Sequence, residues 1–190
     1  MYSASRDSLG EKGGGRIKAK VMEISEDLRV DPDYLMSCMA FETGEIFRPD
    51  IRSAAGGGAT GLVQFMPSTA VGLGTTTDKL SKMTAVEQLE YVHRYFLPSK
   101  GGLRGLEDVY MHILYPAAVG KPGECVIADK YVREDSGVIK IDKNGNKIIN
   151  KIYAQNIGLV VGGNEKISKM EAASKVREKY EKGMGNDFKG

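Results

Sequence analysis

The segment with the clearest potential for chemistry is residues 40–70, AFETGEIFRPDIRSAAGGGATGLVQFMPSTA. Glu42 closes an apolar stretch over residues 35–41, and a glycine-rich loop follows it. A carboxyl group on the apolar face of a helix loses hydration, and this desolvation and the negative helix end both raise its pKa. Such a group can stay protonated near neutral pH, as a general acid must. The pattern also fits a plain structural acid.

Other residues with catalytic or metal-binding side chains have simpler explanations. His93 and His112 lie on predicted helices without the spacing of metal ligands, so we expect both to be structural. Cys38 lies one turn before Glu42 with no base partner for a thiol nucleophile, which predicts a small core residue. Glu87 completes a capping box with the threonine three residues earlier, which explains its carboxylate. We therefore expect no metal site and no cofactor.

The helix that must position Glu42 has clear start and stop signals. The aspartate–proline pair at 31–32 supplies an N-cap and a proline at the first helical position, and Gly44 is a typical C-terminal glycine. Leu35 and Cys38 precede Glu42 by seven and four residues, so the three share one face. Glu42 is therefore predicted to project from the side that packs inward.

Further helices follow from apolar periodicity and capping signals. They are predicted over 16–29, from Met66-Pro67 to Gly74, from Thr84 to Pro98 and from Leu106 to Tyr115. After Gly120 the pattern changes, because SGVIKIDKNGNKIINK alternates apolar and polar residues around Asn144-Gly145. This alternation predicts a β-hairpin. A short helix near 150–156 and a charged helix opened by Ser168 complete the chain.

These elements predict a mainly α fold with three parts. Residues 1–15 are polar and glycine-rich and are expected to form a flexible lead-in. Residues 16–122 form a helical domain with the glycine-rich loop, and residues 123–190 form a small appendage of hairpin, loop and terminal helix. We expect the appendage to pack on the same domain.

Composition excludes some classes of function. The chain has 27 Lys and Arg against 25 Asp and Glu, a net charge of +2, without a basic stripe, so no nucleic-acid partner is expected. No stretch approaches the roughly 20 apolar residues of a membrane span. Two cysteines, Cys38 and Cys125, make no disulfide framework and fit synthesis in a reducing cytosol. The N-terminal residues lack the apolar core of a signal peptide.

The residues from Glu42 onward form a specific combined pattern. FET at 41–43 precedes GATGLVQFMP at 58–67 and STA at 68–70. This combination resembles the lytic transglycosylase and goose-type lysozyme family, whose patterns are Glu-Ser and GA-x-GL-x-Q-x-x-P. TTTDKLSKMTAVEQLEYVHRYF and YMHILYPAAVGKP are similar to its bacteriophage branch. The resemblance covers about residues 20–122.

The resemblance implies an α+β lysozyme-like fold and a peptidoglycan-cleaving enzyme. The bond cut would be the β-1,4 bond between N-acetylmuramic acid and N-acetylglucosamine, with Glu42 as the single acid and base. The implied substrate contacts are Thr43, Gly61, Leu62, Val63, Gln64 and Tyr115. For Gln64 the alternative is an amide that stabilises the turn, and for Tyr115 a hydroxyl that anchors the end of a helix.

A single carboxyl group would suffice for lytic transglycosylation. The muramyl 6-hydroxyl can close on C1 while the same glutamate takes its proton, in contrast to the two-carboxylate scheme of most glycosidases. The nearest acids, Glu45 and Asp50, follow Glu42 in the loop. We expect Glu45 to face solvent, whereas Asp50 could turn towards the cleft. The expected product therefore carries a 1,6-anhydromuramyl end.

The chain departs from the family pattern at four places. Thr43 replaces the serine of the family pattern and keeps the hydroxyl. The loop reads GGGA at 56–59, where relatives often carry a serine before Gly-Ala. The Ala-Tyr-Asn-x-Gly motif is replaced by Leu-Tyr-Pro-Ala-Ala at 114–118, which keeps Tyr115 but not the asparagine. An EF-hand-like loop of phage relatives corresponds to 160–171, where two acidic ligands and the turn glycine are missing, so no tight calcium site is expected.

Two classes of function remain open at this point. The first is a peptidoglycan lytic transglycosylase or lysozyme-type muramidase of a phage, either an endolysin or a virion-borne enzyme. The second is a non-catalytic lysozyme-fold virion component or glycan-binding module. In both, the partners are peptidoglycan glycan strands and other virion proteins. The chain would be made in the bacterial cytoplasm and would act on the cell wall.

Overall fold

The computed structural model describes residues 11–53 and 57–185. In chain order its elements are α2 (Glu11–Leu28), α3 (Pro32–Thr43), α4 (Pro67–Gly72), α5 (Thr77–Leu80), α6 (Ala85–Phe96), η1 (Leu97–Ser99), α7 (Leu106–Leu114), η2 (Pro116–Ala118), β1 (Val126–Asp129), α8 (Lys151–Gln155), η3 (Ile157–Leu159), β2 (Lys166–Ser168) and α9 (Lys169–Gly185). Within these residues the strands β1 and β2 form a two-stranded antiparallel sheet. The expectation of a mainly α fold is confirmed.

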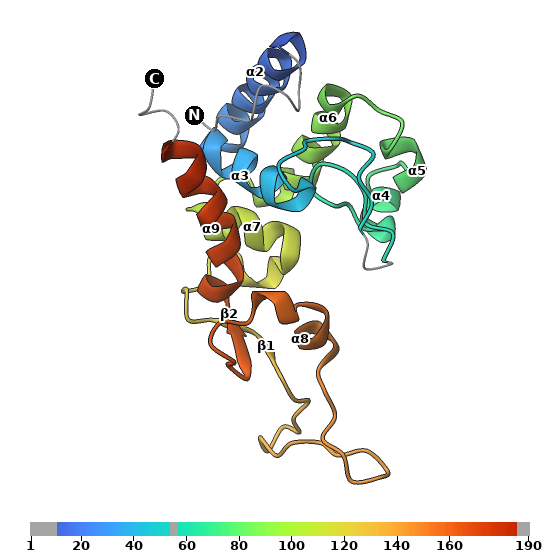
Figure 1. Ribbon diagram of the computed structural model, residues 1–190, viewed down its shortest axis with the longest axis vertical. Coiled ribbons are helices and arrows are strands. Elements are labelled where there is room, and N and C mark those ends of the chain that lie inside the picture. Colours follow the sequence, from blue (N-terminus) through green and yellow to red (C-terminus); the bar gives the residue numbers. More distant parts are fainter. Residues whose placement is uncertain (1–10, 54–56, 186–190) are drawn as a thin grey trace.

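Helix α3 lies at the centre of the packing. It contacts α2, α7 and α9, and α9 also packs on α7 (Figure 1). Helices α2 and α9, at the two ends of the described part of the chain, therefore cover the same central helix. One hydrophobic core includes Met39 of α3, Met111 of α7 and Val176 of α9, each with no exposed surface. The end of the chain thus shares a core with the helical domain.

The predicted lead-in and the observed start of α2 differ. The helix begins at Glu11, so residues 11–15 are helical, and residues 1–10 lie outside the described part of the chain. Ile17 and Val21 lie on the same buried face of α2 as Ile24 and Leu28. Extending a helix that is already anchored adds one hydrogen bond per residue, whereas starting one is costly. The packed face therefore allows the helix to continue through three glycines of low helix propensity.

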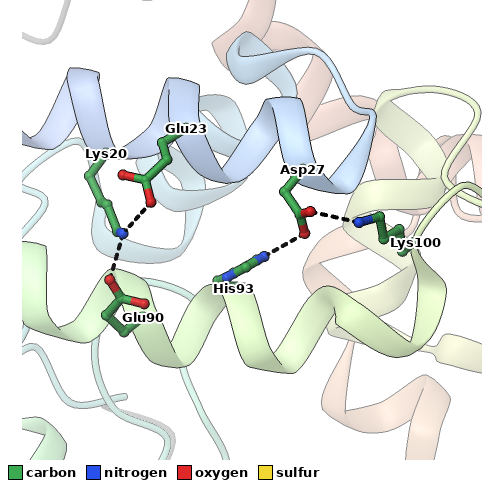
Figure 2. Close-up of polar contacts among 6 residues, drawn as sticks. All are labelled: Lys20, Glu23, Asp27, Glu90, His93 and Lys100. Atoms are coloured by element: carbon green, nitrogen blue, oxygen red, sulfur yellow. Dashed lines mark hydrogen bonds and ion pairs between the residues drawn. The ribbon is translucent and has the colours of Figure 1, made fainter.

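Ion pairs line the contact between α2 and α6 (Figure 2). Lys20 on α2 forms salt bridges with Glu23 on the same helix and with Glu90 on α6. Asp27 on α2 accepts contacts from His93 on α6 and from Lys100. Exposed pairs of this kind contribute about 0–1 kcal/mol each, so they add little to the stability of this contact. The structural role expected of His93 agrees with this position.

A buried ion pair fastens the start of α9 to α7. Lys169 donates to Asp108 and to the carbonyl of Lys121 at 2.8 Å. The backbone N–H groups of Gly120 and Arg104 donate to the same carboxylate. Burial acts to raise the pKa of Asp108, but these donors hold it below its ordinary value. Both side chains are almost fully buried, and every carboxylate oxygen has a partner.

The predicted hairpin lies in an arm that projects from the helical body at the bottom of the view in Figure 1. Ile141 pairs with Lys147 across a turn in which Gly145 has φ +82°, so the chain reverses where the hairpin was predicted, but through an isolated bridge rather than two strands. The preceding turn, 134–137, repeats the geometry eight residues earlier with Gly137 at φ +87°. The pairing of β1 with β2 had no local signal, because the two strands are about 40 residues apart in the chain.

Candidate active site

A cavity of about 580 Å³ opens beside the C-terminal end of α3. Its size falls within the range of small-molecule sites. Its walls come from the end of α3, from a two-stranded ribbon over residues 51–53 and 59–61, and from the end of α7. The lining residues are Phe41, Glu42, Thr43, Gly44, Ile51, Arg52, Ser53, Ala59, Gln64, Met66, Ile113 and Leu114.

Glu42 lies in the last turn of α3, where both helix ends are fixed locally. The Asp31 side chain accepts the N–H of Asp33, and Gly44 adopts φ +61° so that its N–H reaches the carbonyls of Ala40 and Phe41. Glu42 is half-buried, and this desolvation raises its pKa from an ordinary value of 4.5 to about 7. The cavity therefore holds a carboxyl group that can both give and take a proton near neutral pH.

Thr43 connects the helix end to the loop behind it. Its hydroxyl donates to the carbonyl of Met39 at 2.7 Å and accepts the N–H of Phe47 at 3.1 Å. Thr43 also lines the cavity, although only 3% of its surface is exposed. Its hydroxyl is therefore committed to the protein, and the residue acts by fixing the backbone next to Glu42.

A short antiparallel ribbon over 51–53 and 59–61 forms the wall opposite α3. Arg52 pairs with Thr60, the Ser53 N–H donates to Ala59 at 2.9 Å and the Gly61 N–H donates to Ile51 at 2.8 Å. The intervening residues 54–56 lie outside the described part, including the first glycine of the GGGA loop. The ribbon gives this wall a defined backbone despite its many small residues.

Gln64 lines the cavity and stabilises the turn as well. Its backbone has φ +50°, and its Nε2 donates to the carbonyls of Gly61 at 2.9 Å and Ile51 at 3.2 Å. Both amide protons therefore point into the ribbon. Within the described residues its Oε1 accepts no hydrogen bond, so this oxygen is the part of Gln64 that a ligand could reach.

The three residues before Gln64 have structural roles, which differs from the expectation of substrate contact. Leu62 and Val63 are each 1% exposed in the core, and neither they nor Gly61 line the cavity. The Leu62 N–H donates to Oε1 of Gln88 at 2.6 Å. Their backbone is used to build the turn, so in this geometry it does not face the cavity.

Gln88 on α6 is the residue that holds this region together, and the prediction from sequence missed it. It is fully buried, and its Nε2 donates to the carbonyls of Pro49 and Leu80, each at 3.0 Å. With the bond from Leu62, one amide joins three segments around the cavity. A Cβ on Gly61, which has φ +86°, would lie 2.2 Å from Oε1 of Gln88. The glycine is therefore required by close approach.

Tyr115 does not line the cavity. It is the half-buried residue that ends α7, with φ −153°, and its ring packs against the core. Its ring packing favours a structural role, although no hydrogen bond of its hydroxyl is present among the described residues. The negative charge of Glu42 acts instead on Tyr95 and Tyr110, whose pKa values are raised first by burial and then by that charge. Tyr95 donates its hydroxyl to the carbonyl of His112 at 2.9 Å.

The acids nearest to Glu42 in sequence are both held elsewhere. Glu45 forms salt bridges with Lys179 and Lys182 of α9, which lower its pKa, so it does not simply face solvent as expected. Asp50 makes a two-pronged contact with Arg48. Neither lines the cavity, and among the described residues Glu42 is its one carboxyl group.

Histidines and acids do not cluster into a metal site. No group of three His, Cys, Asp or Glu in the described part of the chain could hold a metal ion. His112 is buried, with Nε2 facing the carbonyl of Tyr95 and Nδ1 facing the hydroxyl of Ser99. Burial lowers its pKa, so the neutral ring donates to the carbonyl and accepts from the hydroxyl. Glu171 caps α9 at Ser168 and also accepts from Asn164.

The described helices include none that is both long enough and apolar enough to cross a bilayer. Comparisons of the chain with family models, with curated proteins and with solved structures found no match. The chemistry of this cavity is therefore inferred from its own residues.

Proposed function

We propose that this protein cleaves the β-1,4 bond between N-acetylmuramic acid and N-acetylglucosamine in peptidoglycan, with Glu42 as the acid and base. The observation that carries the proposal is a single half-buried carboxyl group with a pKa of about 7 on the wall of a 580 Å³ cavity. The sequence pattern around it, FET and GATGLVQFMP, supports the same assignment. The fold proposed with it is lysozyme-like.

In the proposed reaction Glu42 acts twice. Protonated Glu42 gives its proton to the glycosidic oxygen as the bond to C1 breaks. The resulting carboxylate takes the proton of the muramyl 6-hydroxyl as that oxygen closes on C1. The glutamate ends as it began, and no water is consumed. A group whose pKa lies near the working pH suits both steps.

The position of the other acids favours this route over hydrolysis. A hydrolase needs a second carboxylate about 5–5.5 Å from the acid for retention, or about 6.5–9.5 Å for inversion. Glu45 and Asp50 are the nearest candidates in sequence, and both are paired with cations away from the cavity. An intramolecular hydroxyl has a high effective molarity and outcompetes water.

The products provide the first test. Digested peptidoglycan should yield muropeptides with 1,6-anhydromuramyl ends, which mass spectrometry detects as products one water lighter than hydrolysis products. Reducing-end muramic acid throughout would mean hydrolysis instead. Asp50→Asn would then show whether Asp50 leaves Arg48 to serve as the second carboxylate.

The pH dependence provides a second test. Donation to the glycosidic oxygen requires protonated Glu42, whose pKa is about 7. Turnover should therefore fall as pH rises through about 7, with a tenfold loss for each further pH unit. A pH–rate profile on soluble peptidoglycan strands measures this limb. A profile that stays flat from pH 6 to 9 would contradict the role of Glu42 as acid.

The biological setting proposed is the bacterial cell wall during phage lysis or entry. Lysis of permeabilised bacteria, followed by turbidity, separates an enzyme from a glycan-binding module. Binding without clearing would favour the module. Presence of the chain in purified particles would favour a virion enzyme over an endolysin.

A further inference from the structure

We propose that Arg52 binds a carboxylate on the muramyl substituent of peptidoglycan, which makes the site selective for this anionic polymer over neutral glycans. This inference rests on the proposed function, and it adds a determinant of substrate choice that acts apart from Glu42.

The charges on the cavity wall are the first observation. Of its lining residues, Glu42 and Arg52 are the two that can carry charge. Glu42 is largely protonated below pH 7, which leaves Arg52 as the charge on this wall under those conditions. An anionic ligand that takes the place of Asp78 therefore meets a positive charge on the cavity lining.

The placement of Arg52 is the second observation. Its backbone is fixed by pairing with Thr60, which has no exposed surface, whereas the Arg52 side chain is 47% exposed. A guanidinium group has five N–H donors. Among the described residues the Arg52 side chain makes one polar contact, between Nη2 and Oδ1 of Asp78 at 2.5 Å. The backbone is thus rigid while most of the guanidinium donors are available.

The contact with Asp78 can be exchanged for a ligand. The Asp78 side chain is 78% exposed, and an ion pair between exposed groups contributes little to stability. A carboxylate that also contacts the cavity replaces this partner at little cost. Guanidinium binds carboxylates through two parallel N–H···O bonds, which adds geometric selectivity.

The chemistry of the substrate supplies such a carboxylate. The muramyl ring carries a lactyl group on O3, which is joined to a short peptide with free carboxylates. When the peptide is absent, the lactyl group itself ends in a carboxylate. The substituent belongs to the ring whose C1 bond is cut, so a cation that lines the same cavity as Glu42 is placed to meet it. Neutral N-acetylglucosamine polymers lack this group.

The test combines three enzymes with three substrates. Wild type, Arg52→Gln and Arg48→Gln are assayed on soluble uncross-linked strands that are native, capped as neutral amides by carbodiimide coupling, or stripped of peptide by an amidase. Arg48→Gln is the matched control, because Arg48 also pairs with an aspartate but lies outside the cavity lining.

On native strands, Arg52→Gln should raise KM about tenfold with kcat unchanged, as expected for loss of a charged hydrogen bond away from the reacting bond. Arg48→Gln should match wild type. Capping should raise the wild-type KM by the same factor and leave that of Arg52→Gln unchanged. On stripped strands, continued dependence on Arg52 shows that the lactyl carboxylate, which is free once the peptide is removed, is also a ligand. Lost dependence shows that Arg52 binds a peptide carboxylate alone.

Equal KM values for wild type and Arg52→Gln on native strands would overturn the inference, as would equal effects of capping on both. Failure of the proposed function looks different, since the wild type would then cut none of the strands. In that case calorimetric binding of native and capped strands decides the role of Arg52. Equal affinity for the two would overturn it.

Discussion

Glu42→Gln should reduce turnover on peptidoglycan strands by about 10²–10⁴-fold, the usual contribution of general acid–base catalysis. The amide keeps the size and polarity of the side chain but can neither give its proton to the glycosidic oxygen nor take one from the 6-hydroxyl. No second carboxyl group among the described cavity residues can replace it. Initial rates of strand cleavage at pH 6 measure the loss.

The same substitution should stabilise the fold above pH 5. The folded-state pKa of Glu42, about 7, lies above its ordinary value of 4.5. The unfolded chain therefore releases this proton first, and wild-type stability falls as pH rises from about 4.5 to 7. Above pH 7 the folded state carries the full cost of a desolvated carboxylate, up to about 3 kcal/mol. The neutral amide of the variant has no such cost.

Chemical unfolding at pH 5 and pH 8 separates this effect from general damage. The advantage of the variant should be small at pH 5 and largest at pH 8. Glu26→Gln is the matched control, because Glu26 is an exposed residue of α2, and it should change neither turnover nor stability. Glu42→Gln with near-normal turnover, or with lower stability at pH 8, would contradict the assignment.

Local signals were sufficient to predict the helix that carries Glu42. The N-cap at Asp31, the proline after it and the glycine at 44 each act within one turn, so the helix bounds follow from neighbouring residues. The capping box of Thr84 and Glu87 is local in the same way and is also confirmed. The inward direction of the Glu42 side chain follows from its spacing to Leu35 and Cys38 on the same helix.

Features that depend on distant residues were not predictable in this way. The pairing of β1 with β2 joins segments about 40 residues apart, and neither strand has a turn next to it that fixes the register. Tyr115 follows the last residue of α7, where the backbone leaves the helix before Pro116, so its ring direction depends on tertiary packing. Helix periodicity does not carry this information.

Gln88 is a residue for which a signal existed in the sequence. It precedes Val92 and Phe96 by four and eight residues, so it shares their buried face of α6. A polar residue on an apolar stripe must find hydrogen-bond partners when it is buried. The spacing therefore indicates a buried amide, but the partners come from three segments that only the fold brings together.

Gln88→Met should greatly reduce the stability of the fold. Methionine keeps the length of the side chain and remains compatible with a helix, but it leaves the Leu62 N–H and the carbonyl of Pro49 without their partner. The carbonyl of Leu80 loses one donor and keeps the N–H of Met83. Each buried group left unpaired costs about 1–3 kcal/mol. The free energy of unfolding should fall by about 3 kcal/mol or more, a large part of the roughly 5–15 kcal/mol typical of a folded domain.

The substitution should also change the shape of the cavity, because this amide holds both the turn before Gln64 and the loop before the ribbon. Differential scanning calorimetry should show Tm lower by roughly 10 °C. Gln155→Met, at an exposed position of α8, is the matched control and should stay within about 0.5 kcal/mol of wild type. Gly61→Ala disrupts the same contact, because the added Cβ would overlap with Gln88 and the positive φ adds strain. It should lower the free energy of unfolding at least as much as Gln88→Met. A Gln88→Met variant as stable as the control would mean that water satisfies the backbone groups that lose Gln88 as their partner. The hydrogen bonds of Gln88 would then not be what holds the cavity wall in place.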